Sequence, residues 1–250
     1  MDNAYLQKQH LIMPSEADAI SLWRPDAIFT VMQELAGEHS ILLGCGRSEI
    51  LSEQGVVWML ARVHLKMERY PALLDEVSIR TWPGANGRAT FPRYFEVFSA
   101  GGERLGMAAT SWVLADLSTR KLVLPSAANL FFPDEPAFSP PLDEPGRFRA
   151  DASGGAAFSR QVCYSDVDEN GHVNNARYVT WITDLFPIQR HMRGRISELK
   201  ISFSSEVRPE YGAAELTLRE DGSEFFVVGT ANGKTSFEAV GRWSDLNQMQ

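Results

Sequence analysis

The chain repeats one order of hydrophobic patterns, and this repeat constrains its fold more than any other feature of the 250 residues. In each half a short alternating stretch comes first, at residues 5–13 and 158–165. One long helical pattern then follows, and after it a run of alternating segments typical of strands. One helix and several strands in each half predict an α+β fold, in which the helix covers one face of an antiparallel sheet.

The two helical patterns share the same spacing of apolar residues. Apolar side chains recur at i, i+3, i+4, i+7 and i+8, which places them on one face of a helix; they are Ile28, Val31, Met32, Leu35 and Ala36 in the first half and Tyr178, Trp181, Ile182, Leu185 and Phe186 in the second. Such a broad stripe favours a central helix wrapped by a curved sheet. A helix lying flat on a sheet would show the same pattern.

A proline-rich segment, residues 131–155, separates the two halves. It contains Pro133, Pro136, Pro140, Pro141 and Pro145 and ends with Gly154 and Gly155. Prolines at this density interrupt helices and central strands, so we expect an extended linker. The predicted domains are therefore residues 1–130 and 156–250.

Composition and charge exclude several classes of protein. Cys45 and Cys163 are the only cysteines, too few for a disulfide scaffold or a cysteine-based zinc site. No apolar run approaches the roughly 18–20 residues of a membrane helix, and the N-terminus lacks a secretory signal, so we expect a cytoplasmic protein. The net charge of −8 argues against general nucleic-acid binding. An acidic partner would need a local basic patch.

The densest polar cluster, residues 164–175, lies between a predicted strand and the second helix. Calcium binding is one interpretation, because Asp166, Asp168, Asn170 and Gly171 match the opening of an EF-hand loop. The twelfth position of that loop should be a bidentate Glu, but it is Arg177. We therefore predict no metal site.

Two further interpretations of this cluster remain. Asn and Asp residues form turns and helix caps, and Asn174 or Asn175 is the expected cap of the second helix. A cap does not account for His172, which in a catalytic interpretation transfers a proton beside carboxylates. The free N–H groups of a helix N-terminus would also stabilise a developing oxyanion.

The motif Asp168-x-Asn170-x-His172-Val173-Asn174-Asn175, followed by Tyr178 and Trp181, resembles the signature of the acyl-acyl carrier protein (acyl-ACP) thioesterases of plants and bacteria. Segments of the first half are similar to the same family, namely Val57-Trp58-Met59-Leu60-Ala61-Arg62, Tyr70-Pro71, Thr81-Trp82-Pro83 and Ser111-Trp112-Val113-Leu114. The resemblance implies two tandem hotdog folds, each a long helix wrapped by a curved antiparallel sheet. It also implies hydrolysis of fatty acyl-ACP to free fatty acid and ACP, which terminates fatty acid synthesis, without a cofactor.

The resemblance also implies a set of catalytic residues: Asp168, Asn170, His172 and Glu206. Some members of the family have been assigned a cysteine beside the Glu, but here the neighbour is Val207. We therefore expect water to attack the thioester, with Glu206 or His172 as the base. Asp168 would orient its neighbours, Asn170 would position the carbonyl or the water, and the N–H groups of Val173, Asn174 and Asn175 would bind the oxyanion.

The first half lacks the corresponding polar residues, because residues 15–26 contain no His or Asn. One active site per chain is expected, with the first half supplying the acyl pocket. Met32, Leu35 and Trp58 are the candidate lining residues.

The carrier protein is acidic, so we expect a basic docking surface formed by Arg177, Arg190, His191, Arg193 and Arg195. A homodimer is possible through an exposed sheet edge. Three other functions remain open at this point: an acyl-CoA thioesterase, a hotdog dehydratase and a non-catalytic acyl-binding module.

Overall fold

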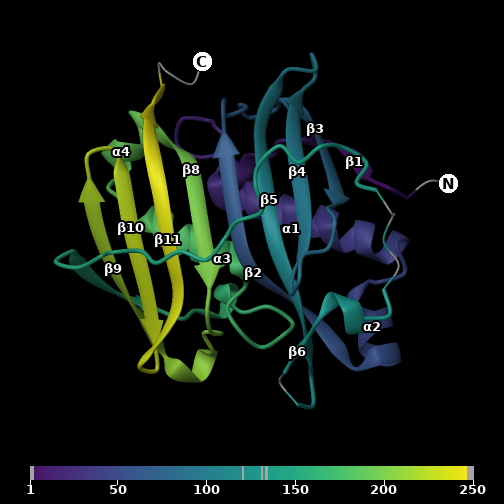
Figure 1. Ribbon diagram of the computed structural model, residues 1–250. Coiled ribbons are helices and arrows are strands. Elements are labelled where there is room, and N and C mark those ends of the chain that lie inside the picture. The colour runs from purple at the N-terminus through teal and green to yellow at the C-terminus, as the bar shows by residue number, and fades with distance from the viewer. Residues whose placement is uncertain (1–2, 120, 131, 133–134, 247–250) are drawn as a thin grey trace.

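The structure, a computed structural model, describes residues 3–119, 121–130, 132 and 135–246. One antiparallel sheet holds all of the named strands (Figure 1), which are β1 Leu6–Leu11, β2 Val56–Met67, β3 Glu76–Pro83, β4 Phe91–Ser99, β5 Arg104–Asp116, β6 Leu122–Val123, β7 Ala156–Gln161, β8 Gly194–Phe203, β9 Ala213–Asp221, β10 Glu224–Ala231 and β11 Lys234–Asp245. The helices are α1 Pro25–Leu42, α2 Arg47–Gln54, α3 Asn175–Asp184 and α4 Ile188–His191. Among the described residues, none of these helices is both long and apolar enough to cross a membrane.

The strand order shows the repeat that the sequence predicts. The first half runs β1-β3-β4-β5-β2 across the sheet, and the second half runs β8-β11-β10-β9-β7, which is the same order reversed. The halves meet where β2 pairs antiparallel with β8, with Val63 opposite Ile201 and Leu65 opposite Leu199. These four side chains are buried. The two halves therefore form one continuous sheet around a local two-fold relation.

The helices α1 and α3 contact each other on one face of this sheet, behind it in the view of Figure 1. Ile28, Met32 and Leu35 of α1 share one hydrophobic core with Trp181 and Ile182 of α3. The chain leaves α1 through Gly44, whose φ of 70° is the left-handed conformation that commonly ends helices. The predicted α+β tandem hotdog fold is confirmed.

The described part of residues 131–155 forms no helix or strand and crosses the outer face of the sheet (Figure 1). Phe131, Pro133 and Asp134 lie outside the described residues. Trp82 Nε1 donates to Phe138 O at 3.0 Å, Arg62 Nε donates to Pro145 O at 2.7 Å, and Ser111 Oγ donates to Glu144 Oε1 at 2.6 Å. Because this segment covers the outer face, β4 is buried along most of its length. The division into an acyl-binding and a catalytic domain stays a prediction.

Candidate active site

The polar cluster forms a loop between β7 and α3 that is held by its own carboxylates. Asp166 is 2% exposed and its Oδ2 accepts the N–H of Cys163 at 2.9 Å, which closes the 3₁₀ turn Tyr164–Asp166. In the first half, Glu16 Oε2 accepts the N–H of Met13 at 2.8 Å in the same way. Asp166 therefore has the structural role that one interpretation of the sequence gives it.

Asp168 organises the next turn of the loop. Its Oδ1 accepts the N–H of Asn170 at 2.8 Å, and its Oδ2 accepts Nδ2 of Asn174 at 3.3 Å. Its backbone N–H donates to His172 O at 3.1 Å. Gly171, between them, has a φ of 78°, which a residue with a side chain adopts only with strain. Asp168 thus fixes the backbone that presents His172, while the Asn170 side chain is exposed at the tip of the loop.

The loop brings His172 to Glu206. His172 Nε2 lies 3.6 Å from Glu206 Oε1, and the two side chains are 28% and 30% exposed. Glu206 Oε2 also lies 3.1 Å from Arg208 Nη2. The segment that carries Glu206 follows the end of β8, and it is tied to the loop because the N–H of Val173 donates to Val207 O at 2.8 Å. Two residues 34 positions apart thus form an imidazole–carboxylate pair open to solvent on one side.

A buried tyrosine lies under this pair. The hydroxyl of Tyr178, in the first turns of α3, accepts the N–H of Val207 at 3.3 Å. Burial raises the pKa of Tyr178, and the nearby Glu206 and Asp168 carboxylates raise it further. The hydroxyl therefore stays protonated close to both carboxylates.

The structure corrects part of the predicted oxyanion site. The N–H of Val173 is bonded to Val207 O, and the N–H of Asn174 donates to Asp166 O at 2.9 Å. Neither is free to bind substrate, so the prediction is wrong for these two groups. Asn174 is the helix cap, since its Oδ1 accepts the N–H of Ala176 at 2.9 Å. The N–H of Asn175, the first residue of α3, has no protein acceptor among the described residues.

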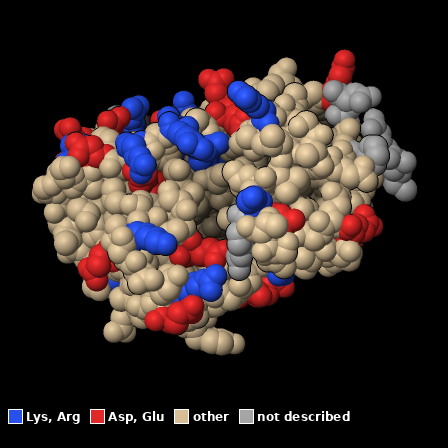
Figure 2. Space-filling model, turned by 60° about the horizontal axis from the view of Figure 1, so that its bottom comes forward, with Lys and Arg blue, Asp and Glu red and all other residues tan. Residues whose placement is uncertain are grey.

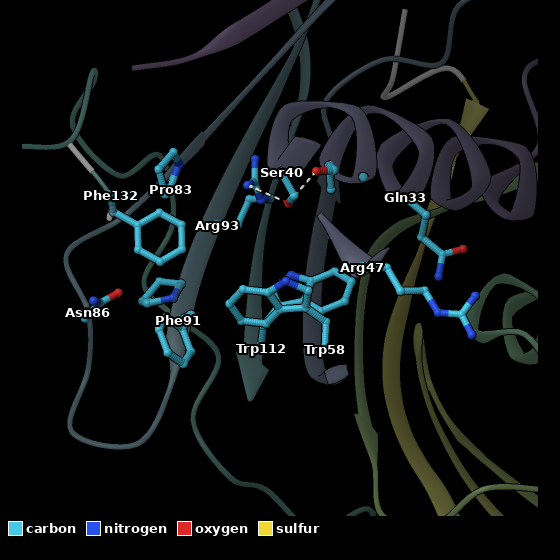
Figure 3. Close-up of a pocket in the computed structure, with 13 residues that line it drawn as sticks. Gln33, Ser40, Arg47, Trp58, Pro83, Asn86, Phe91, Arg93, Trp112 and Phe132 are labelled. Carbon is cyan, nitrogen blue, oxygen red and sulfur yellow. Dashed lines mark hydrogen bonds between the residues drawn. The ribbon is translucent and has the colours of Figure 1, made fainter. Parts of the chain in front are cut away.

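A cavity of about 170 Å³ lies in the first half, between α1 and the strands β2, β4 and β5 (Figure 3). Its lining combines aromatic rings with polar side chains: Gln33, Ala36, Gly37, Ser40, Arg47, Trp58, Pro83, Asn86, Phe91, Pro92, Arg93, Trp112 and Phe132. Of the predicted lining residues, Trp58 is present. Met32 and Leu35 are not, because they are 4% and 5% exposed and pack in the main core. The cavity lies against a different face of α1, the one that carries Gln33, Gly37 and Ser40.

Arg47 connects this cavity to the loop of the second half. It lines the cavity at the start of α2, and its Nη1 pairs with Oε1 of Glu169, which directly follows Asp168. Figure 3 shows its side chain extending away from Phe132 and Asn86, toward the second half. A second hollow of about 550 Å³ is lined by Asp168, Glu169 and the residues that open the loop.

The predicted docking arginines are dispersed. Arg195 is 2% exposed, and its Nη2 pairs with Asp18 Oδ2 at 2.6 Å, so its prediction as a surface residue is wrong. Arg190 lies in α4, at the opposite end of the sheet from the end of β8 that leads to Glu206 (Figure 1), and its guanidinium stacks 5.2 Å from the Trp243 ring. Arg193 is exposed just beyond α4, and Arg177 is half-buried in the first turn of α3.

The sequence did not predict how charged side chains gather on the face of the molecule that carries the loop between β7 and α3. Figure 2, which brings forward the bottom of Figure 1, shows acidic side chains in a hollow and Lys and Arg around it.

Among the described residues, no cluster of three His, Cys, Asp or Glu could hold a metal ion.

The two cysteines differ in exposure. Cys45 is buried, and burial raises the pKa of its thiol to about 11, so it remains a neutral thiol. Cys163 is exposed at the start of the loop, beyond the end of β7.

Comparisons with known proteins agree across the two halves. A family model for the acyl-ACP thioesterase N-terminal domain matches residues 3–125, and one for the acyl-ACP thioesterase C-terminal domain matches residues 155–244. The chain is 25% identical to the chloroplastic oleoyl-acyl carrier protein thioesterase 2 of Arabidopsis thaliana, over 94% of this chain and 69% of that one. It is 28% identical to the chloroplastic dodecanoyl-[acyl-carrier-protein] hydrolase of Umbellularia californica, over 79% of this chain and 55% of that one.

Solved structures show the same fold. An acyl-ACP thioesterase from Bacteroides thetaiotaomicron superposes with a TM-score of 0.86 at 24% identity, covering 97% of this chain and 99% of the other. The 12:0-ACP thioesterase from Umbellularia californica superposes with a TM-score of 0.83 at 22% identity, covering 97% and 98%. Since the two family models together match most of the sequence, in the order of the two structural halves, the chain belongs to the acyl-ACP thioesterase family.

Proposed function

We propose that this protein hydrolyses the thioester of a fatty acyl group carried by ACP and releases free fatty acid and ACP. The observation that carries the proposal is the His172–Glu206 pair, 3.6 Å apart. Arg47 links the loop of this pair to the cavity of the first half. The names of the relatives support the same substrate. In a cell this reaction would terminate fatty acid synthesis in the cytoplasm.

The chemistry we propose uses water as the nucleophile. The His172–Glu206 pair takes one proton from the water as its oxygen attacks the carbonyl carbon. The carbon–sulfur bond of the resulting tetrahedral intermediate then breaks, and the proton passes to the leaving thiolate. The products are a carboxylic acid and the free thiol of the carrier arm, so no cofactor takes part.

The other residues of the loop support this step. Asp168 holds the turn that presents His172, and the exposed Asn170 side chain would position the thioester carbonyl or the water. The N–H of Asn175 is the remaining candidate donor to the oxyanion, at the positive end of α3.

We propose that ACP docks on basic side chains near the loop that carries His172. Of the predicted arginines, Arg177 fits this surface, because it lies in the first turn of α3, which follows the loop. Charge reversal at Arg177 should raise KM for acyl-ACP more than for the matching acyl-CoA. An equal rise for both substrates would remove Arg177 from the docking surface.

The test is thiol release from acyl-ACP and from acyl-CoA, with the wild type, His172→Gln and Glu206→Gln. Glu68→Gln is the matched control, because Glu68 holds the corresponding place in the first half and pairs on the surface with Arg104. Cys163→Ser is the common background, since the exposed Cys163 thiol would react with the reagent.

We expect kcat to fall at least about a hundredfold for each catalytic variant, while Glu68→Gln retains activity. The double variant should be no worse than the worse single variant, because paired residues act as a unit. A folded wild type that releases no thiol from acyl-ACP overturns the proposal, as does an equal loss in Glu206→Gln and Glu68→Gln. Faster release from acyl-CoA would reassign the carrier, and conversion of a hydroxyacyl substrate without thiol release would indicate a dehydratase.

A further inference from the structure

Both backbone groups of Val207, the residue after Glu206, are bonded to the elements that carry the rest of the site. Val207 O accepts the N–H of Val173, in the loop that carries His172, at 2.8 Å. The N–H of Val207 donates to the hydroxyl of Tyr178, in α3, at 3.3 Å. This N–H belongs to the peptide bond that joins Val207 to Glu206. The backbone next to the Glu206 carboxylate is therefore fixed from two sides.

Glu206 lies beyond the sheet, so no strand pairing holds it. β8 ends at Phe203, and the N–H groups of Ser204 and Ser205 then donate to Ser236 O at 2.8 and 3.2 Å. Among the described residues, the next backbone hydrogen bonds along the chain are those of Val207. The position of Glu206 thus depends on the two bonds that Val207 makes.

The ring of Tyr178 is held in one place by its surroundings. It is 3% exposed, and three aromatic rings lie in edge-to-face contact with it. Their centroids are 5.3, 5.5 and 5.0 Å away, for Trp181, Phe203 and Phe237. Because burial raises the pKa of Tyr178, its neutral hydroxyl accepts the Val207 N–H without adding a negative charge beside Glu206.

The first half shows what this position needs for packing alone. Ile28 holds the place of Tyr178 in the repeated apolar stripe, and it is equally buried, at 0% exposure. A hydrocarbon side chain therefore fills this place in the half that lacks the polar cluster. The hydroxyl is present in the half that contains His172 and Glu206, so it adds a function that packing does not require.

We propose that Tyr178 is a positioning residue of this active site. Its hydroxyl holds the N–H of Val207 and thereby keeps the Glu206 carboxylate beside His172. The inference rests on the proposed thioesterase function, and in this role Tyr178 acts through Glu206 rather than on the substrate. A shift of about 1 Å in a catalytic group lowers rates by up to about a hundredfold, so the loss of one of the two bonds should reduce turnover.

The experiment is thiol release from acyl-ACP by Tyr178→Phe, which removes the hydroxyl and keeps the ring, in the Cys163→Ser background. We expect kcat to fall about tenfold while KM stays within about twofold, because the change moves a catalytic group and leaves substrate binding intact.

Tyr70→Phe is the matched control, because it also removes one buried hydroxyl. Tyr70 is 5% exposed, and its hydroxyl donates at 2.8 Å to the carbonyl of Ile196, near the end of β8 that lies away from Glu206. Its kcat should stay within about twofold of the wild type.

A double-mutant cycle separates positioning from a general structural effect. In the Glu206→Gln background, Tyr178→Phe should lower kcat by less than about twofold, since the carboxylate that it positions is gone. A partial loss of folded enzyme would instead lower kcat by the same factor in both backgrounds.

A second measurement needs no variant and decides the matter should Tyr178→Phe fail to fold. The amide proton of Val207 in the wild type should exchange with solvent far more slowly than an unstructured amide. Exchange within about tenfold of the unstructured rate would show that the hydroxyl does not hold this N–H, and would overturn the inference.

The kinetic outcomes that contradict the inference are equally specific. An unchanged kcat in Tyr178→Phe, an equal fall in Tyr70→Phe, or the same fall in both backgrounds would leave Tyr178 as a packing residue. A rise in KM at unchanged kcat would assign the hydroxyl to substrate binding and also reject the inference. All of these results leave the thioesterase function standing, whereas no thiol release from acyl-ACP by the wild type would reject the function itself.

Discussion

Gly37 offers a direct test of whether the cavity of the first half binds the acyl chain and limits its length. It lies in the interior of α1 and lines the cavity, and a Cβ built on it meets no atom within 4 Å. A larger side chain there should extend into open space rather than into backbone. Replacing a helical Gly also removes a conformational penalty of about 0.5–1 kcal/mol, so Gly37→Leu should not unfold the protein.

The size of the effect follows from the four carbon atoms of the leucine side chain. If these displace about four methylenes of a bound acyl chain, the loss is about 0.8 kcal/mol for each, or about 3 kcal/mol in all. That corresponds to a fall of about 200-fold in kcat/KM for chains long enough to reach Gly37. Shorter chains should be hydrolysed as before.

The assay is kcat/KM for thiol release across a series of unsubstituted acyl-ACP lengths, with Gly37→Ala as the control for helix stabilisation. We expect the optimum of Gly37→Leu to move to shorter chains and that of Gly37→Ala to stay near the wild type. An equal fall at every chain length would show that the acyl chain does not occupy this cavity.

Three further predictions concern stability, measured by urea denaturation. Burial and the nearby Arg93 guanidinium lower the pKa of His39 from 6.5 to about 4, so the stability that the neutral ring contributes is present above pH 6.5 and is lost as the pH falls toward 4. The protein should therefore be about 2 kcal/mol less stable at pH 5 than at pH 7. The variant His39→Gln should flatten this pH dependence. Asn174→Ala removes the cap of α3 and should cost about 1 kcal/mol, whereas Asn170→Ala, a change at the exposed loop tip, should leave stability nearly unchanged. Arg195→Ala should cost about 3 kcal/mol by breaking the buried pair with Asp18, with no selective rise in KM for acyl-ACP; a selective rise would restore Arg195 to the docking surface.

The sequence predicted the fold well because its hydrophobic periodicity reports which side chains face the core. The stripe of Ile28, Met32 and Leu35 identified the buried face of α1. The same reasoning misplaced the cavity, since a face lined with Gly37 and Ser40 has no hydrophobic signal. A void is defined by the distance between elements, which periodicity along one element does not specify.

For the candidate site, the sequence predicted which side chains lie close together better than it predicted their backbone hydrogen bonds. The family motif placed His172 and Glu206 together, as the structure has them. The motif could not show that the N–H groups of Val173 and Asn174 are already bonded, because backbone partners depend on the path of distant segments. The sequence also did not indicate that Arg93 is buried and lines the cavity. Nothing in a single sequence distinguishes a buried arginine without a carboxylate partner from a solvated one.

The seam between β2 and β8 limits how a substrate can enter and leave. Backbone hydrogen bonds span it, and buried side chains on both strands pack beside it, so the halves cannot hinge apart during turnover without breaking the sheet. Access to the interior must therefore come from motions that leave this strand pairing intact. The Arg47–Glu169 contact, which joins α2 to the loop before α3, is a natural place for such a motion to begin.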